Sequence, residues 1–390
     1  MLIGAHKKEG ERVKQSDTNT EVFFALLRAG LWERDIQLGA LGAIDYAEIF
    51  RIALEQSVVG LIAAGLEHVT DVKIPQDVAL SFAGAALQIE QRNVAMNSFL
   101  GELVDKMRAE GIYALLLKGQ GIAQCYDRPL WRASGDMDFL LSNDNYIKAK
   151  AFLSSLATRV ENENPHTLHL ALQIQNWEVE LHGNLRNGLW RKMDKALDKV
   201  QYSLFYEGKV RSWMNGRTQV FLPGWDEDVT YVFAHILQHF YKEGIGLRQI
   251  CDWCRLLWTF KDDIDSGLLK FRLFAMGCES EWKSFAAFAV NYLGMPSVAM
   301  PLYSSEGKWH KKAEYIADYV LKVGNFGHNQ GIEGYKGSSV FRRKLDTMKR
   351  GAGYAMRHFY IFPAHSLESF GYMLKLGISK VFGNYRIKEI

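Results

Sequence analysis

The stretch ASGDMDFLLS, residues 133–142, places two aspartates one residue apart at the head of an apolar run. Residues two apart in a strand point to the same face of a sheet, so Asp136 and Asp138 are predicted to project together. Met137 and Phe139 then face the other way. Two adjacent carboxylates repel each other unless they are solvated, one is protonated, or a cation lies between them. A hard divalent cation is the usual reason for such a pair, which makes this strand a candidate metal site.

The residues around this strand predict a small mixed sheet. Short apolar or alternating runs bounded by glycine or polar residues are typical of strands, and longer runs with helical spacing are typical of helices. In chain order we expect a strand, a helix, a strand, a helix and two strands, over residues 112–119, 120–126, 136–142, 143–157, 168–175 and 177–183. Two of these connections contain a helix, which favours a mixed α/β sheet.

A hairpin is expected to close this sheet. The alternating runs KVRSWM (residues 209–214) and RTQVFL (residues 217–222) are joined by Asn215 and Gly216. Asn-Gly between such runs is a strong hairpin signal, because both central positions of the turn need positive φ.

Helical periodicity flanks the sheet region on both sides. Thr20 is a candidate N-cap for a helix over residues 21–35, and further helices are expected over 45–67 and 76–109. From residue 224 onward the pattern is helical again.

The expected fold class is therefore α+β, with a small mixed-sheet core flanked by helical regions. We place an N-terminal helical region at residues 1–95, the α/β core at 96–224 and a C-terminal helical domain at 225–390.

The composition is that of a globular protein. Of the 390 residues, 48% are hydrophobic and 23% are charged, which excludes a disordered or fibrous chain for most of its length. The net charge of +3 is too close to neutral to indicate a nucleic-acid partner. No apolar run has the length of a membrane span, no signal-peptide pattern precedes the first helix, and the four cysteines fit reduced thiols. The expected location is the cytoplasm.

A third carboxylate is expected from the strand WEVELHG, residues 177–183. Alternation places Glu178, Glu180 and His182 on one face of that strand. If this strand lies beside the Asp136/Asp138 strand, either glutamate is able to complete a three-carboxylate cluster. Such a cluster suits Mg²⁺ or Mn²⁺, which retain water ligands and bind substrate phosphates.

A phosphate site is expected at the turn after the first strand. Lys118 ends the run LLLK, and Gly119 leads into a short helix whose N-terminal amides are able to hold phosphate oxygens. Arg132 lies four residues before Asp136 and adds a cation with bidentate geometry.

This ordered set resembles the polymerase-β-type nucleotidyltransferase superfamily. The resemblance is to the bacterial group of nucleotidyltransferase family proteins of unknown acceptor, in which a Lys-Gly turn precedes an Arg-x-x-x-Asp-x-Asp element and a later Glu-Leu-His strand. Here these elements are Lys118-Gly119, Arg132 to Asp138, and Glu180 to His182. The layout matches over about residues 20–260.

The resemblance implies roles for individual residues. Asp136 and Asp138 would bind metal, Glu180 rather than Glu178 would be the third carboxylate, and Gly119 would form the phosphate turn. Further expected substrate contacts are Ser134 and Gly135 on the approach to the metal strand, His182, and the pair Arg248 and Asp252. His182 has the equal alternative of satisfying a sheet edge.

The segment HILQHFYKEGIGLRQICDWC, residues 235–254, has three interpretations. His235 and His239 share a helical face, and Cys251 and Cys254 follow as CxxC, which are the ligand types of a zinc site. Two packed helices with buried cysteines explain the same pattern. The third interpretation follows from the resemblance, in which a similar helix pair lines the acceptor side of the cleft.

The aromatic tail at residues 354–374 also has two interpretations. Basic residues are interleaved with aromatic residues there, as on protein surfaces that bind single-stranded nucleic acid. Apolar spacing of three and four explains the tail as helix core, and nucleic acid is not the expected partner.

The expected function is transfer of a nucleoside monophosphate from an NTP to a hydroxyl of a small-molecule or protein acceptor. Two Mg²⁺ would be held by the three carboxylates, and Lys118 and Arg132 would hold the triphosphate. Gln120 stands where the superfamily usually has serine or glycine, which favours a non-catalytic module that binds a nucleotide or partner. Retention of all three carboxylates argues against that module. A metal-dependent phosphohydrolase is a third alternative, identified by release of inorganic phosphate.

Overall fold

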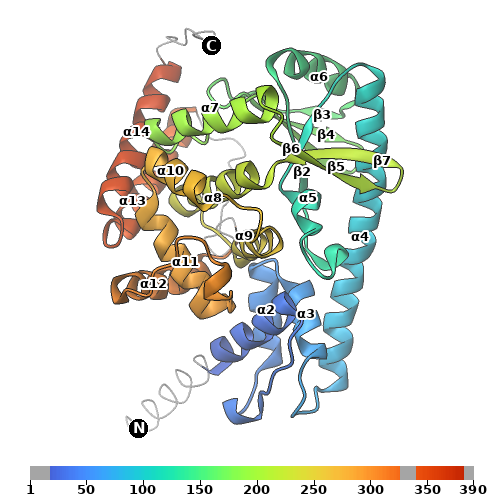
Figure 1. Ribbon diagram of the computed structural model, residues 1–390, viewed down its shortest axis with the longest axis vertical. Coiled ribbons are helices and arrows are strands. Elements are labelled where there is room, and N and C mark those ends of the chain that lie inside the picture. Colours follow the sequence, from blue (N-terminus) through green and yellow to red (C-terminus); the bar gives the residue numbers. More distant parts are fainter. Residues whose placement is uncertain (1–17, 326–339, 382–390) are drawn as a thin grey trace.

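The computed structural model describes residues 18–325 and 340–381, which form a sheet packed between helices (Figure 1). The fold is α+β with helical flanks, as the sequence predicted. The N-terminal part consists of a helix over residues 18–32, a 3-10 turn η1 and two helices, with bounds Gly39–Leu41 (η1), Tyr46–Glu55 (α2) and Val59–Glu67 (α3). The long helix α4 (Gln76–Ala109) then runs along one side of the molecule from these helices to the sheet (Figure 1).

The sheet has seven strands in the order β3-β4-β5-β2-β1-β7-β6. Their bounds are Leu115–Leu117 (β1), Asp136–Leu140 (β2), Arg159–Val160 (β3), His169–Ile174 (β4), Trp177–His182 (β5), Val210–Asn215 (β6) and Thr218–Pro223 (β7). The pairs β2–β5 and β1–β7 are parallel and the other four are antiparallel, so the predicted mixed sheet is confirmed.

The two faces of β2 have different neighbours, because its side chains alternate. Met137 and Phe139 pack in a core cluster with α4 and with α6 (Asn143–Leu156). Leu140 lies on the opposite face and belongs to a second cluster, which includes residues of the C-terminal helices. Asp136 and Asp138 therefore share one face, as the alternation predicted, and that face lies toward the C-terminal helices.

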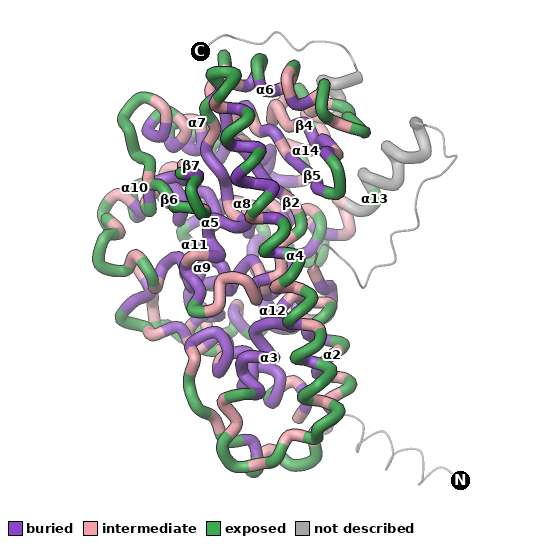
Figure 2. Tube along the Cα trace, turned by 90° about the vertical axis from the view of Figure 1, so that its right-hand side faces the viewer, coloured by how far each residue is buried: buried purple, intermediate pink, exposed green. Residues whose placement is uncertain are grey.

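The remaining helices connect and cover the sheet. α5 (Gly119–Ala123) and the 3-10 turn η2 (Pro129–Trp131) link β1 to β2, and α7 (Arg191–Tyr206) links β5 to β6. The C-terminal elements are α8 (Trp225–Lys242), α9 (Leu247–Thr259), α10 (Ser266–Met276), α11 (Glu279–Leu293), η3 (Ser297–Ala299), α12 (Gly307–Val323), α13 (Val340–Phe359) and α14 (Pro363–Val381). Buried residues form a continuous interior along α8, α9 and α11, whereas much of α4 is exposed (Figure 2).

The N-terminal helices depart from the prediction at two points. The first helix already includes residues 18–20, so Thr20 lies inside it and is not its N-cap. The single helix expected over 45–67 is broken between α2 and α3, where Ser57 has a φ of 56°. The adjacent Gln56 is buried and bonds the distant Val320 carbonyl and Leu247 amide at 2.9 and 3.0 Å, which a local pattern does not reveal.

The hairpin β6–β7 is present, but its turn is displaced by one residue. Asn215 pairs with Thr218 as the last rung of the ladder, so Gly216 and Arg217 are the central turn residues. Gly216 has a φ of 62°, whereas Asn215 stays in the strand and donates to the Asn97 carbonyl at 2.7 Å. That long-range bond accounts for the shift. β3 and α7 were not expected from the sequence.

The predicted domain boundaries fall at different kinds of position. α4 is continuous through residues 95 and 96, and the second predicted boundary coincides with the start of α8 at Trp225. The three domains therefore stay a prediction about independent folding units. No helix within residues 18–325 and 340–381 is long and apolar enough to cross a membrane.

The aromatic tail contributes to the interior of the helical region. Tyr354, His358, Ile361 and Phe362 are buried, whereas Tyr360 is exposed. The His358 ring stacks on Phe240 of α8, with ring centroids 4.0 Å apart. These contacts support the helix-core interpretation for this part of the tail.

Burial of His358 predicts an acid-sensitive contact between α13 and α8. Its Nε2 donates to the Phe240 carbonyl at 2.8 Å, and burial lowers the imidazole pKa to about 3. Since an unfolded histidine has a pKa of about 6.5, the unfolded state binds protons first as the pH falls. Stability from this site is fully present above about pH 6.5 and is lost below it, by about 1.4 kcal/mol per pH unit.

Thermal unfolding of the unsubstituted protein and of His358→Gln between pH 7.5 and 5 measures this effect. Glutamine keeps a donor near the Phe240 carbonyl but does not titrate, so the variant should lose less stability over that range. Parallel pH profiles for the two proteins would assign the acid sensitivity to other groups.

Candidate active site

Three carboxylates meet where β2 and β5 lie side by side. The parallel register places Asp136 beside Glu178 and Asp138 beside Glu180. Carboxylate oxygens of Asp136, Asp138 and Glu180 all lie within 4.8 Å of one another, which is close enough to hold a metal ion. Glu178 is exposed and is not a member of this group. The predicted strand adjacency is therefore confirmed, and Glu180 is the glutamate that lies with the two aspartates.

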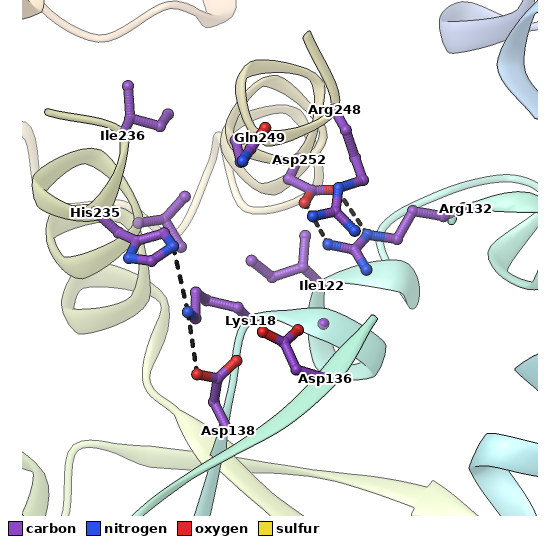
Figure 3. Close-up of a pocket in the computed structure, with 12 residues that line it drawn as sticks. Lys118, Ile122, Arg132, Asp136, Asp138, His235, Ile236, Arg248, Gln249 and Asp252 are labelled. Carbon is purple, nitrogen blue, oxygen red and sulfur yellow. Dashed lines mark hydrogen bonds and ion pairs between the residues drawn. The ribbon is translucent and has the colours of Figure 1, made fainter. Parts of the chain in front are cut away.

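The turn that carries Lys118 has an unusual backbone. Lys118 has φ 52° and ψ −144°, a region that strongly favours glycine, and Gly119 follows with a φ of 47° at the start of α5. Such conformations in a residue with a side chain persist only when the surroundings fix them, and they cluster at functional sites. The turn directs the Lys118 side chain between two partners, with Nζ 3.2 Å from Asp138 Oδ1 and 3.2 Å from His235 Nε2 (Figure 3).

The charges around this turn determine the protonation states of Lys118 and His235. Burial lowers the pKa of Lys118, but the attraction of Asp138, Tyr231, Asp136 and Glu180 outweighs it and raises the pKa above the ordinary value. Burial, and then the charge of Lys118, holds the pKa of His235 well below its ordinary range. Lys118 is therefore an ammonium that donates to a neutral imidazole.

Two histidines lie against the carboxylates on the sheet. His182 Nε2 is 2.8 Å from Asp138 Oδ1 and 3.5 Å from Glu180 Oε2, and His169 Nε2 is 2.9 Å from the same Glu180 oxygen. Burial lowers the pKa of His182, but its two acidic partners raise it to about 9. Burial raises the pKa of Glu180, but hydrogen bonds from both histidines lower it below the ordinary range.

His169 was missed in the sequence. It lies on β4 directly opposite His182 of β5 in the antiparallel register. The signal was present, because LHLALQIQ alternates as WEVELHG does, but the register of two strands is needed to bring the histidines together.

Two arginines line the same region as Asp136 and Asp138: Arg132 on the segment before β2 and Arg248 on α9 (Figure 3). Arg132 donates to both oxygens of Asp252 on α9, at 2.9 and 2.5 Å, and to Ser134 Oγ at 2.8 Å. Tyr126 also donates to Asp252, at 2.8 Å, and Arg248 bonds the Ala133 carbonyl at 2.8 Å.

A cavity opens between these groups (Figure 3). Figure 3 shows Lys118, Asp136 and Asp138 on one side and side chains of α8 and α9 on the other. The lining residues are Lys118, Gly119, Ile122, Arg132, Asp136, Asp138, Val232, His235, Ile236, Arg248, Gln249 and Asp252. Four predicted site residues, Ser134, Gly135, Glu180 and His182, lie outside this lining. Ser134 contacts Arg132, and Gly135 is exposed before β2.

Gln120 does not face the cavity. It is buried and donates to Asn93 Oδ1 at 2.9 Å, and Asn93 in turn donates to the carbonyls of Leu130 and Arg132 at 2.8 and 2.7 Å. The residue after Gly119 thus connects α5 to α4 and holds the segment that carries Arg132.

The zinc interpretation finds no support in the structure. The ligand groups close enough to share an ion within residues 18–325 and 340–381 are Asp136/Asp138/Glu180 and His169/Glu180/His182. Neither group contains His235, His239 or a cysteine of α9. Cys251 and Cys254 are fully buried in the apolar core between the packed helices.

Comparison with known protein families agrees with this geometry. The family described as "Uncharacterised nucleotidyltransferase" matches residues 42–294, which is more than half of the chain. The chain belongs to this family. Neither the curated proteins nor the solved structures contained a match. The matched range begins before α2 and ends after α11. It includes the whole sheet and the two helices that line the cavity, α8 and α9.

Proposed function

We propose that the protein transfers a nucleoside monophosphate from an NTP to a hydroxyl of a small-molecule or protein acceptor, releasing pyrophosphate. The observation that carries this proposal is the convergence of Asp136, Asp138 and Glu180 within 4.8 Å, beside the Lys118-Gly119 turn. The proposal draws also on the nucleotidyltransferase family and on the resemblance to polymerase-β-type enzymes.

The donor set fits Mg²⁺ or Mn²⁺. All three groups offer carboxylate oxygens, which are the ligands that these hard cations prefer, and Asp136 borders the open cavity. When bound, such ions would activate an attacking hydroxyl and offset negative charge at phosphorus. Asp136, Asp138 and Glu180 would hold them.

The basic residues around the cavity suit a triphosphate. Lys118, Arg132 and Arg248 all line it, and so does Gly119, the first residue of α5. Asp252 is a positioning residue in this scheme, because it fixes the guanidinium of Arg132 through two hydrogen bonds. Ser134 and Gly135 would shape the approach to β2, and His182 would orient Asp138.

The net charge of the protein argues against a polynucleotide as the acceptor. A net charge of +3 over 390 residues provides little of the positive field that polynucleotide binding requires. We therefore assign a small molecule or a protein hydroxyl as the acceptor. His235, Ile236 and Gln249 from α8 and α9 form the opposite wall, on which we place it.

A non-catalytic module that binds a nucleotide or partner is the second candidate. Asp138 Oδ1 already contacts Lys118 Nζ at 3.2 Å and His182 Nε2 at 2.8 Å, so its charge is compensated by the protein itself. Nucleotide binding without pyrophosphate release, in the presence of a pool of candidate acceptors, would favour this module.

Calorimetric titration with each NTP, with and without Mg²⁺, tests the proposal. Asp136→Asn should weaken Mg²⁺-dependent NTP binding by more than about 10-fold, because it removes a metal ligand. Asp144→Asn is the matched control, since Asp144 is an exposed residue of α6, and it should bind as the unsubstituted protein does. Equal binding by both variants would place the nucleotide elsewhere.

A further inference from the structure

Two histidines and a glutamate converge on the sheet beside the carboxylate cluster. His169 and His182 lie opposite each other on β4 and β5, with ring centroids 4.9 Å apart. Their Nε2 atoms lie 2.9 and 3.5 Å from one oxygen, Glu180 Oε2. Ligand atoms of all three residues lie within 4.8 Å of one another. Adjacent, paired strands therefore hold a compact set of three metal-ligating groups.

We propose that His169, Glu180 and His182 form a second metal site, selective for a first-row transition ion such as Zn²⁺. Two imidazole nitrogens and one carboxylate suit Zn²⁺ and other borderline ions, whereas Mg²⁺ is bound almost entirely by oxygen. Two histidines and one glutamate with an open position is a donor set of catalytic zinc sites. The three-carboxylate cluster has the opposite preference, so the two sites would select different ions.

Access and rigidity both suit an ion site. The side chains of His169, Glu180 and His182 are 34%, 19% and 14% exposed, so an ion reaches them from solvent. Their backbones lie in the ladder between β4 and β5, which fixes the spacing of the ligands. The remaining coordination positions are open to water or to a substrate oxygen.

Glu180 joins the histidine site to the carboxylate cluster, because it belongs to both groups. His182 Nε2 contacts Asp138 Oδ1 at 2.8 Å, so binding an ion through that nitrogen replaces a contact with the cluster. An ion at one site therefore changes both the charge and the hydrogen bonding of the other. The histidine site itself is defined by β4 and β5, and it does not depend on nucleotidyl transfer.

Titration of the metal-free, full-length protein with Co²⁺ tests the site, because Co²⁺ bound by nitrogen and oxygen in an open coordination sphere absorbs visibly. We expect one such ion per chain. His169→Gln should weaken its binding by more than about 10-fold, since it removes a direct ligand. Asp136→Asn should keep the absorption, because Asp136 is not in the histidine group.

His68→Gln is the matched control. His68 also lies between two carboxylates, with ring nitrogens 2.7 Å from Glu33 and 3.1 Å from Asp35, but it is not part of a metal-ligating group. This variant should bind Co²⁺ as the unsubstituted protein does. Circular dichroism of each variant checks that it is folded.

A second measurement needs no substitution. In NMR spectra of histidine side chains, Zn²⁺ should shift the resonances of two imidazoles at one equivalent, whereas ion binding by carboxylates alone would shift neither strongly. Absence of such shifts would overturn the proposal. So would Co²⁺ absorption that persists in His169→Gln and disappears in Asp136→Asn. Failure of NTP binding with Co²⁺ binding intact would instead contradict only the proposed function.

Discussion

Replacing Asp252 by alanine is expected to lower the free energy of unfolding by about 3–5 kcal/mol. The side chains of Arg132 and Asp252 are only 6% and 5% exposed, and they form two hydrogen bonds of 2.9 and 2.5 Å. Removal of the carboxylate leaves a buried guanidinium without its counter-charge and removes the acceptor of the Tyr126 hydroxyl. Unfolding of the unsubstituted protein and of Asp252→Ala by guanidinium chloride measures this loss of free energy.

Two further variants separate charge burial from other causes. Arg132→Met/Asp252→Leu removes both charges, and it should recover much of the lost stability because neither residue is left unpaired. Asp262→Ala removes an exposed ion pair with Lys261 just after α9, and it should leave the unfolding midpoint unchanged. A small effect of Asp252→Ala would mean that water reaches Arg132.

The Arg132–Asp252 pair also shows how the helical region and the sheet region form one site. The two residues are 120 positions apart in the chain, on the segment before β2 and on α9. Arg248, one turn earlier on α9, bonds the Ala133 carbonyl of the same segment. Helix α9 therefore fixes the approach to the aspartates, and it lies within residues 42–294, the range that the family model matches.

Local pattern was sufficient to predict the parts of the site that lie within one strand or one turn. Alternation alone placed Asp136 and Asp138 on one face, because the side-chain period of a strand is two. The bounds of α4 also followed from local signals, with Pro75 before it and Gly111, at a φ of 67°, after it. Neither prediction needed a distant partner.

Features that depend on distant partners were beyond the sequence. Gln56 interrupts the expected helix by bonding α9 and α12, and Asn215 stays in β6 by bonding α4. His169 becomes part of the site only through the β4–β5 register. In each case a contact between residues far apart decides the local structure, and propensity is too weak to oppose it.

Glu180→Gln is expected to reduce nucleotidyl transfer by more than about 100-fold, because loss of a direct metal ligand should exceed the 10–100-fold effects of outer-shell changes. Glu180 is the member of the cluster that β5 contributes, and its oxygen lies with those of Asp136 and Asp138. Pyrophosphate release from each NTP, with a pooled small-molecule extract as the source of acceptor, measures the rate.

Glu178→Gln is the matched control on the same strand and the same face. Glu178 is exposed and lies outside both ligand groups, and burial together with repulsion from Glu180 and Asp136 raises its pKa. Because its charge opposes those of the cluster rather than completing it, its loss should leave transfer nearly unchanged. An equal loss in both variants would mean that the acidic face acts as a whole, whereas a larger loss in Glu178→Gln would reassign the third carboxylate. The β2–β5 register pairs Glu178 with Asp136 and Glu180 with Asp138, so the comparison tests which glutamate that register brings to the cluster.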